Sequence, residues 1–327
     1  MEKKRVVSGM RPSGRLHLGH LVGALDNWKK LQETHRCYFF VADWHALTSE
    51  YADTSQIKEY IREIGIDWLS AGIDPERSTL FIQSRIPEHA ELHLLLSMIT
   101  PLPWLERNPT YKEQLQEVTT RDLSTYGFLG YPVLQAADIL IYKANYVPVG
   151  VDQMPHIELT REIARRFNSL YQEILVVPEG MLTQFPKVPG LDGRKMSKSY
   201  QNVILLSDSA REIRAKVRPM VTDPARARRT DAGNPEACPV FDLHKVYTPS
   251  ALHGGLIEGC KTAGIGCLDC KEILLGHLWG AMEEIHAKRQ ELAASPKRID
   301  EILEEGSLRA RHEAVRTLSQ IKEAVGI

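Results

Sequence analysis

The sequence predicts an α/β fold: a doubly wound parallel sheet followed by an all-helical C-terminal domain. In the first third of the chain, short apolar runs alternate with segments of helical periodicity. From about residue 207 onward, no strand-like run remains. The 327 residues suggest two domains, because a domain usually has about 100–200 residues. We place the boundary near residue 203, so that the two domains comprise residues 1–203 and 204–327.

The first half of the sheet follows from three apolar runs and two connecting helices. Buried strands are predicted at residues 4–8, 37–42 and 79–83 because each run is short and rich in β-branched or aromatic residues. Apolar residues at helical spacing predict helices over 17–32 and 53–72. This order of elements is the nucleotide-binding half of a Rossmann-type sheet.

The middle of the chain is predicted to add one strand, several helices and a loop. The strand covers 146–151, and the helices cover 88–98, 111–123, 131–142 and 154–167. Residues 186–199 hold two prolines and two glycines without helical periodicity, which predicts a mobile loop. In the second domain, helices are predicted at 210–217, 271–292 and 308–325.

Composition excludes several classes of protein. Apolar residues make up 43% of the chain and charged residues 25%, as in ordinary globular proteins. The formal net charge of −1 argues against a chromatin-type cation, although a local basic face could still bind a polyanion. No apolar run has the roughly 18–20 residues of a membrane span, and no signal peptide is visible. We therefore expect a cytoplasmic protein without a membrane partner.

A histidine-containing segment lies between the first strand and the first helix. We call residues 12–20 (PSGRLHLGH) the histidine loop. A doubly wound sheet holds phosphates at this place, because the free N–H groups of a helix start favour anions. His17 and His20 can add donors there, and Gly19 leaves room for a purine. The alternative is a plain turn with two hydrogen-bonded surface histidines.

A second segment supplies positive charge. The chain contains neither GxxxxGK[ST] nor GxGxxG, so another element must hold the phosphates of a nucleotide. The best candidate is the lysine loop, residues 195–199 (KMSKS), in which Lys195 and Lys198 can contact a triphosphate as point charges. The alternative is a solvated loop without a ligand.

Together, the two loops resemble the HIGH and KMSKS signature pair of class I aminoacyl-tRNA synthetases. Their order, their separation of about 175 residues and the strand–loop–helix context all agree. Other stretches resemble the tryptophan and tyrosine branch, most closely the bacterial tryptophanyl-tRNA synthetases. The similarity covers nearly the whole chain and includes residues 8–14, 43–48, 105–107, 131–140, 148–153 and 156–161.

The resemblance implies a homodimeric enzyme that uses ATP and Mg²⁺ to activate L-tryptophan and then charges tRNA(Trp). The amino-acid carboxylate would attack the α-phosphate without a general base, so catalysis would depend on positioning and on charge stabilisation. The implied catalytic residues are His17, His20, Lys112, Lys195 and Lys198. The implied ATP-binding residues are Arg11, Ser13, Gly19, His20, Gly150, Asp152, Lys195, Met196, Ser197, Lys198 and Ser199.

The implied tryptophan-binding residues are His45, Tyr131, Gln135, Asp138 and Gln153. Asp138 lies in an apolar helix, where a carboxylate needs a partner. By resemblance it accepts the indole N–H, while Tyr131 and Gln153 hold the α-amino group; the alternative is a carboxylate satisfied by a backbone turn. Gln135 and Arg11 depart from the usual bacterial tryptophan pattern, so a tyrosine–tRNA ligase stays open. A silent RNA-binding paralogue and a nucleotidyltransferase without tRNA are the other rivals.

Four of the five cysteines form a cluster in the second domain: Cys238, Cys260, Cys267 and Cys270. In a reducing compartment such a cluster predicts a metal site before it predicts disulfides. The thiolates suit a [4Fe–4S] cluster or Zn²⁺, and the remaining alternative is unligated buried thiols. A subset of tryptophanyl-tRNA synthetases resembles this arrangement and holds an iron–sulfur cluster near the anticodon. Basic residues nearby suggest an RNA-binding face, namely Arg226, Arg228, Arg229, Lys245 and Lys261.

Overall fold

The computed structural model describes residues 3–109, 123–182 and 188–327. Its centre is a five-stranded sheet of order β3-β2-β1-β4-β5, in which all neighbouring strands are parallel. The strands are β1 (Arg5–Met10), β2 (Arg36–Val41), β3 (Ser78–Ile82), β4 (Tyr146–Val149) and β5 (Glu179–Leu182). The strand order reverses between β1 and β4, and ligands of doubly wound sheets bind at the carboxyl ends of the strands at such a point. The predicted fold class is confirmed.

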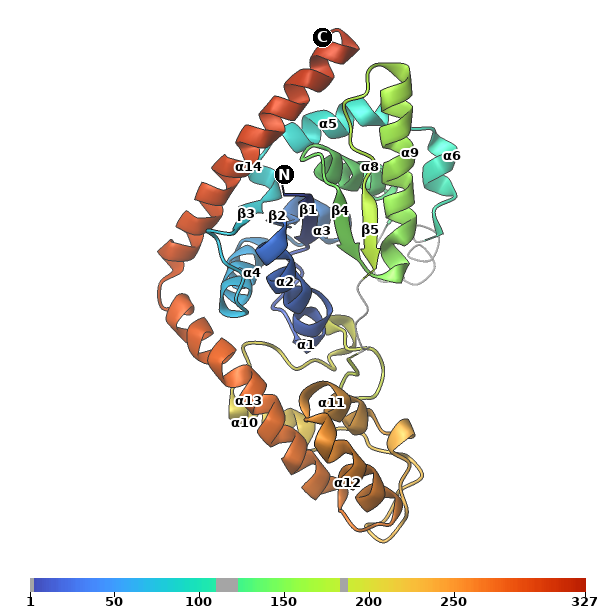
Figure 1. Cartoon of the computed structure of the whole chain (residues 1–327), viewed down its shortest axis with the longest axis vertical. Coiled ribbons are helices and arrows are strands. Elements are labelled where there is room, and N and C mark those ends of the chain that lie inside the picture. Colours follow the sequence, from blue (N-terminus) through green and yellow to red (C-terminus); the bar gives the residue numbers. More distant parts are fainter. Residues whose placement is uncertain (1–2, 110–122, 183–187) are drawn as a thin grey trace.

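Helices cover both faces of the sheet (Figure 1). They are α1 (Leu18–His20), α2 (Asp26–Thr34), α3 (Asp43–Glu50), α4 (Ile57–Ser70), α5 (Glu88–Ser97), α6 (Leu102–Glu106), α8 (Tyr126–Leu140) and α9 (Met154–Leu170). A π-helical segment, Leu21–Leu25, joins α1 to α2, so the helix predicted over 17–32 is confirmed with a local widening. The helix predicted over 111–123 lies almost entirely outside the described residues.

The strands bury side chains on both faces, as parallel strands between helices must. On one face Val6, Phe39 and Leu80 join a core that includes Trp28, whose ring stacks on Phe39 at a centroid distance of 4.1 Å. The opposite face belongs to a second core, built around α5, α8 and α9. These two cores hold the strand ends of the site in place.

The described chain after residue 207 consists of helices and loops without a strand, as predicted. The helices are α10 (Ala210–Val217), α11 (Pro239–Tyr247), α12 (Ser250–Lys261), α13 (Cys267–Ala293) and α14 (Pro296–Val325). Figure 1 shows α11 and α12 at the end of the molecule away from the sheet, while α14 runs back past β3. At Gly306 a Cβ atom would lie 1.8 Å from the Leu80 carbonyl oxygen, so α14 touches the backbone of β3.

Several elements differ from the sequence prediction. The structure adds β5, α3, α6, α11 and α12, and α14 begins at Pro296 instead of residue 308. Among the described residues, no helix combines the length and the apolar character needed to cross a membrane.

Candidate functional site

The site lies at the carboxyl ends of β1 and β4, where two cavities adjoin. Their volumes are about 300 Å³ and about 330 Å³. The larger cavity extends to His20 and Gly150, and the smaller one lies against Tyr131 and His156. The two share the lining residues Gly9, Phe40, Gln135, Asp138 and Gln153. Two bound molecules could therefore meet at this shared wall.

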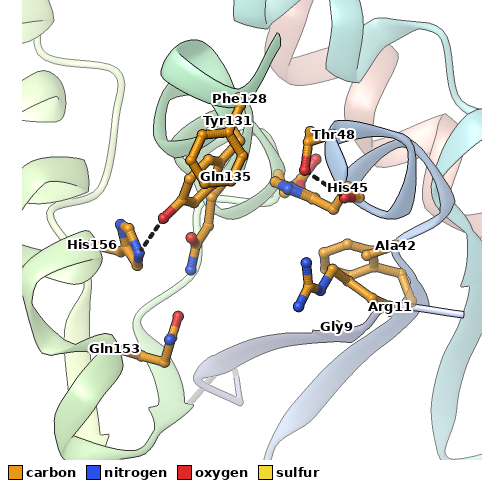
Figure 2. Close-up of a pocket in the computed structure, with 12 residues that line it drawn as sticks. Gly9, Arg11, Ala42, His45, Thr48, Phe128, Tyr131, Gln135, Gln153 and His156 are labelled. Atoms are coloured by element: carbon orange, nitrogen blue, oxygen red, sulfur yellow. Dashed lines mark hydrogen bonds and ion pairs between the residues drawn. The ribbon is translucent and has the colours of Figure 1, made fainter. Parts of the chain in front are cut away.

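The smaller cavity combines aromatic walls with polar groups (Figure 2). All five residues predicted to bind tryptophan line it: His45, Tyr131, Gln135, Asp138 and Gln153. The rings of Phe40 and Phe128 supply apolar surface, and Arg11 lies at the opposite side from Tyr131. Such a mixture suits an aromatic ligand that carries polar ends.

Tyr131 is held by a buried histidine. His156 Nε2 lies 3.0 Å from the Tyr131 hydroxyl, and its Nδ1 lies 3.2 Å from the Asn108 amide nitrogen. Burial lowers the pKa of His156 to about 4, so the ring is neutral at neutral pH. With Asn108 donating to Nδ1, Nε2 carries the hydrogen and donates to Tyr131. The Tyr131 oxygen then keeps one lone pair for a ligand.

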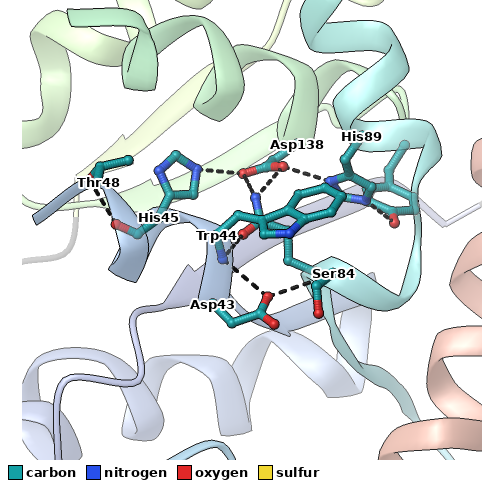
Figure 3. A network of polar contacts seen from close by, with 9 residues as sticks. Asp43, Trp44, His45, Thr48, Ser84, His89 and Asp138 are labelled. Carbon is teal, nitrogen blue, oxygen red and sulfur yellow. Dashed lines mark hydrogen bonds and ion pairs between the residues drawn. The ribbon is translucent and has the colours of Figure 1, made fainter. Parts of the chain in front are cut away.

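Asp138 is the centre of a buried polar network (Figure 3). Asp138 Oδ2 lies 2.8 Å from His45 Nε2, and Oδ1 lies 2.6 Å from His89 Nδ1. Gln83 Nε2 donates to both carboxylate oxygens, at 2.8 and 2.9 Å. Burial raises the pKa of Asp138, but the hydrogen bonds from His45 and His89 outweigh it and lower the pKa to about 2. Asp138 is thus an ionised carboxylate satisfied by side chains of other elements, not by a backbone turn.

The histidine loop is held by its own histidines. His17 Nδ1 accepts the Gly19 N–H at 3.1 Å, and the His17 N–H donates to His20 Nδ1 at 3.2 Å. Burial lowers the pKa of His17 to about 4 and the pKa of His20 well below its usual value. Both rings are therefore neutral, and since each Nδ1 is an acceptor, each Nε2 carries a hydrogen.

The fold brings the lysine loop against the histidine loop. Lys198 Nζ donates to the Gly14 carbonyl at 2.7 Å. The strand-like segment that follows the lysine loop pairs with the histidine loop: the Leu18 N–H donates to the Ile204 carbonyl at 3.0 Å. Burial lowers the pKa of Lys198 to about 8, so this lysine is still mostly protonated at pH 7. Two segments about 175 residues apart thus contact each other, and His20 of the histidine loop lines the larger cavity.

Comparisons with known proteins agree with this arrangement. The family model for tRNA synthetases class I (W and Y) matches residues 1–275. This chain belongs to that family. The Thermotoga maritima tryptophan–tRNA ligase is 53% identical to this class I synthetase over 325 residues, 99% of each chain. The Aquifex aeolicus tryptophan–tRNA ligase is 45% identical and covers 99% of this chain and 100% of its own.

A solved structure matches the whole synthetase. Tryptophanyl-tRNA synthetase from Campylobacter jejuni, complexed with ADP and tryptophan, superposes with a TM-score of 0.90. It is 34% identical in sequence, and the match covers 99% of this chain and 100% of that one. The similarity therefore extends across the sheet and the C-terminal helices.

Other predicted residues of the synthetase occupy different positions around the cavities. Gly150 lines the larger cavity, and a Cβ atom there would lie 2.6 Å from the Asp152 carboxylate. Met196 is buried, whereas Lys195 and Ser13 are exposed. The Ser197 N–H donates to Asn202 Oδ1 at 2.8 Å, and Ser199 lies in the short 3-10 turn Lys198–Tyr200. Lys112 lies outside the described residues.

Cys238, Cys260 and Cys267 of the synthetase lie within electrostatic range of Cys270. Burial, together with the three other thiols, raises the pKa of Cys270 to about 12. His244 Nε2 lies 3.3 Å from Cys270 Sγ, and Arg226 Nη1 lies 3.8 Å from Cys260 Sγ. All five cysteines are free thiols. Within the described ranges, however, no group of three or more His, Cys, Asp or Glu side chains is arranged to hold a metal ion.

One residue of the predicted basic face is not on the surface. Arg226 is buried and donates to the Ile265 carbonyl at 2.7 Å and the Arg229 carbonyl at 3.1 Å, so its inclusion in that face was wrong. Lys245 is exposed but forms ion pairs with Glu236 and Asp242. Arg228 and Lys261 are exposed, which leaves a smaller basic surface than the sequence suggested.

Sequence analysis also missed residues that support the site. Gln83 and His89 hold Asp138, and His156 with Asn108 holds Tyr131. A signal existed for His156, because it lies one helical turn after Gln153, at the start of α9. For Gln83 and His89 the sequence offers only their positions after a buried strand.

Proposed function

We propose that this synthetase is a tryptophan–tRNA ligase. It activates L-tryptophan with ATP and Mg²⁺ to tryptophanyl-adenylate and transfers the tryptophanyl group to tRNA(Trp). The observation that carries the proposal is the pair of adjoining cavities: the larger one reaches His20 of the histidine loop, and the smaller one is lined by aromatic and polar groups. The names of the relatives from Thermotoga maritima and Aquifex aeolicus support it.

The larger cavity binds ATP in this proposal. The carboxylate of the amino acid attacks the α-phosphate in line, and pyrophosphate leaves. The Nε2–H groups of His17 and His20 donate to phosphate oxygens, because their Nδ1 atoms are already engaged with the loop backbone. Lys198 leaves the Gly14 carbonyl and neutralises charge on the departing pyrophosphate, with Lys195 as a second cation. No side chain needs to remove a proton in this step.

The smaller cavity selects the side chain. Three protein groups donate to Asp138, and Gln83 Nε2 contacts both of its oxygens, so in this proposal the indole N–H takes the place of one of the two Gln83 contacts. Tyr131 and Gln153 accept from the α-ammonium group at the same time. A site built around such hydrogen bonds rejects analogues without the donor by roughly 10⁴-fold or more. Specificity then requires no editing site.

Charging of tRNA tests the proposal. Purified protein, ATP–Mg²⁺ and either tryptophan with tRNA(Trp) or tyrosine with tRNA(Tyr) are incubated, and the aminoacylated tRNA is measured. We expect product only with tryptophan. Product only with tyrosine would assign the chain to the other branch of its family and make Gln135 the residue to explain. Absence of product in both reactions would favour a silent RNA-binding protein.

We further propose that residues 204–327 form the anticodon-binding domain and that its four cysteines hold a [4Fe–4S] cluster. The mutual effect of the thiols on the pKa of Cys270 supports this, because a cation would relieve the same repulsion. To bind the cluster, the four cysteine side chains would have to move closer together than they are in this structure. Iron, sulfide and zinc analysis of anaerobically purified protein, with a visible spectrum, distinguishes an iron–sulfur cluster from zinc and from unligated thiols.

A homodimer and a cytoplasmic location complete the proposal. Large apolar side chains are exposed around α5, α6 and the start of α8, and these elements pack together. The exposed residues are Leu94, Met98, Leu102 and Tyr126. Such a surface is typical of an interface with another protein chain. Sedimentation of the purified protein tests the dimer, and Met98→Glu is expected to favour the monomer. The free thiols fit a reducing compartment.

A further inference from the structure

A buried ion pair lies beneath the two signature loops. Asp67 of α4 is 0% exposed and Arg289 of α13 is 7% exposed. Arg289 Nε donates to Asp67 Oδ1 at 2.7 Å, and the same guanidinium forms an ion pair with Glu63. An arginine fork between two carboxylates has a more defined geometry than a surface ion pair.

The acidic side of this cluster holds the histidine loop. Asp67 Oδ2 accepts the backbone N–H of Leu16 at 3.0 Å, and Leu16 directly precedes His17. Glu63 pairs with Arg15 at 3.2 Å, one residue earlier. Two consecutive residues of the loop are thus tied to carboxylates that Arg289 itself holds.

The same carboxylate acts on the lysine loop. Burial lowers the pKa of Lys198, and the negative charge of Asp67 opposes this effect, so the two groups lie within electrostatic range. The Leu16 carbonyl in turn accepts the Leu206 N–H at 2.9 Å, just after the lysine loop. Asp67 therefore lies under both loops that contact ATP in the proposed function.

Stability alone does not explain this pair. A buried ion pair is weak evidence for stability, because well-packed apolar residues often serve as well in its place. The partner of Asp67 also lies on a helix that begins far from the loops. Arg289 follows Cys267, the first residue of α13, by 22 residues, which corresponds to about 33 Å of continuous helix. The helix α13 thus runs from the cysteine region to α4, which carries Asp67 (Figure 1).

The geometry points to Asp67 and Arg289 as positioning residues that fix the histidine loop for ATP and connect it, through α13, to the helical region. This inference rests on the proposed function, because it assumes that the histidine loop binds ATP. Neither residue lines either of the two cavities. They act by holding the backbone that carries His17, and a misplacement of about 1 Å at a reacting centre can cost about 10²-fold in rate.

Steady-state ATP–pyrophosphate exchange tests the inference with Arg289→Met, Arg289→Lys and Asp67→Asn. We expect Arg289→Met to lower kcat/KM for ATP by about 10–100-fold while KM for the amino acid stays within about twofold. Arg289→Lys, which keeps the charge without the fork, should recover part of the loss. Asp67→Asn keeps an acceptor for Leu16 and should lose less than Arg289→Met.

Arg62→Met is the matched control. Arg62 lies on α4, five residues before Asp67, and pairs with Asp300 of α14 on the surface at 2.8 Å. Arg62→Met should leave kcat/KM for ATP and KM for the amino acid unchanged. If the Arg289 variants raised both KM values equally with a lower melting temperature, or left ATP kinetics unchanged, the inference would be overturned.

The two proposals can fail separately. If wild-type protein exchanged only with tyrosine, the tryptophan assignment would fail, yet the ATP effect would still be measurable with tyrosine. Should Arg289→Met not fold, the comparison of Arg289→Lys and Asp67→Asn with Arg62→Met decides the question. An effect on ATP kinetics in either of the two supports positioning, and its absence in both contradicts it.

Discussion

Replacing Asp138 by asparagine tests the polar network and the substrate pocket in one variant. The carboxylate accepts from His45, Gln83 and His89, and asparagine offers one oxygen and one NH₂ group instead. The NH₂ group must then face a histidine nitrogen that carries a hydrogen in the wild type. At least one hydrogen bond is lost unless a histidine changes its tautomer.

The magnitude follows from the pKa of Asp138. A shift from 3.8 to about 2 corresponds to about 2 kcal/mol of folding free energy, at 1.36 kcal/mol per unit. Because the pKa is lowered in the folded state, this stabilisation is present above pH 3.8 and is lost as the pH falls toward 2. Asparagine has no charge to lose. The variant should therefore be less stable by about 2 kcal/mol at pH 7, and the difference should shrink below pH 4.

Two assays check this prediction. Denaturant unfolding at pH 7 and pH 3 measures stability, and ATP–pyrophosphate exchange measures use of tryptophan, which we expect to collapse. Asp43→Asn is the control, because Asp43 Oδ1 accepts the Trp44 and Ser84 N–H groups, an amide oxygen can do the same, and its carboxylate lines neither cavity. Unchanged stability together with normal tryptophan use in Asp138→Asn would refute the reasoning.

Three further predictions concern the lysine loop, the smaller cavity and the cysteines. Burial lowers the pKa of Lys198 to about 8, so kcat/KM for ATP should fall above that pH as the lysine loses its charge. Lys198→Arg should remove this fall. A wild-type profile of kcat/KM that stays flat to pH 10 would contradict the prediction. Tyr131→Phe removes the hydroxyl bonded to His156 and should raise KM for tryptophan about tenfold, and an equal rise in KM for ATP would speak against it. If the four cysteines hold the proposed cluster, Cys267→Ser should abolish its visible absorption and bound iron but keep pyrophosphate exchange. Loss of exchange would mean that the cysteine site supports the catalytic domain.

The sequence predicts the strands and helices whose apolar pattern is strong. The runs at β1, β2 and β3 are long and apolar enough to identify, and α10 begins and ends where expected. In contrast β5 has four residues, EGML, without a β-branched side chain. Three glycines weaken the helical signal of α12. The start of α14 could have been found from Pro296, because proline favours the first turn of a helix.

For the site, the sequence predicts residues that belong to motifs but not the residues that hold them. His45, Tyr131 and Asp138 line one cavity. They could be predicted because all three lie in stretches that resemble the family. Gln83 lies 55 residues before Asp138 and His89 lies 49 residues before it, and no local pattern links side chains so far apart. Only the packing of the elements that carry them makes these contacts.

The most direct test of the account is ATP–pyrophosphate exchange by the wild-type protein, with tryptophan and tyrosine in parallel. The account predicts exchange that depends on tryptophan, because the Asp138 carboxylate lines a cavity beside the proposed nucleotide site and can accept the indole N–H. Exchange with tyrosine instead, or with neither amino acid, would contradict it.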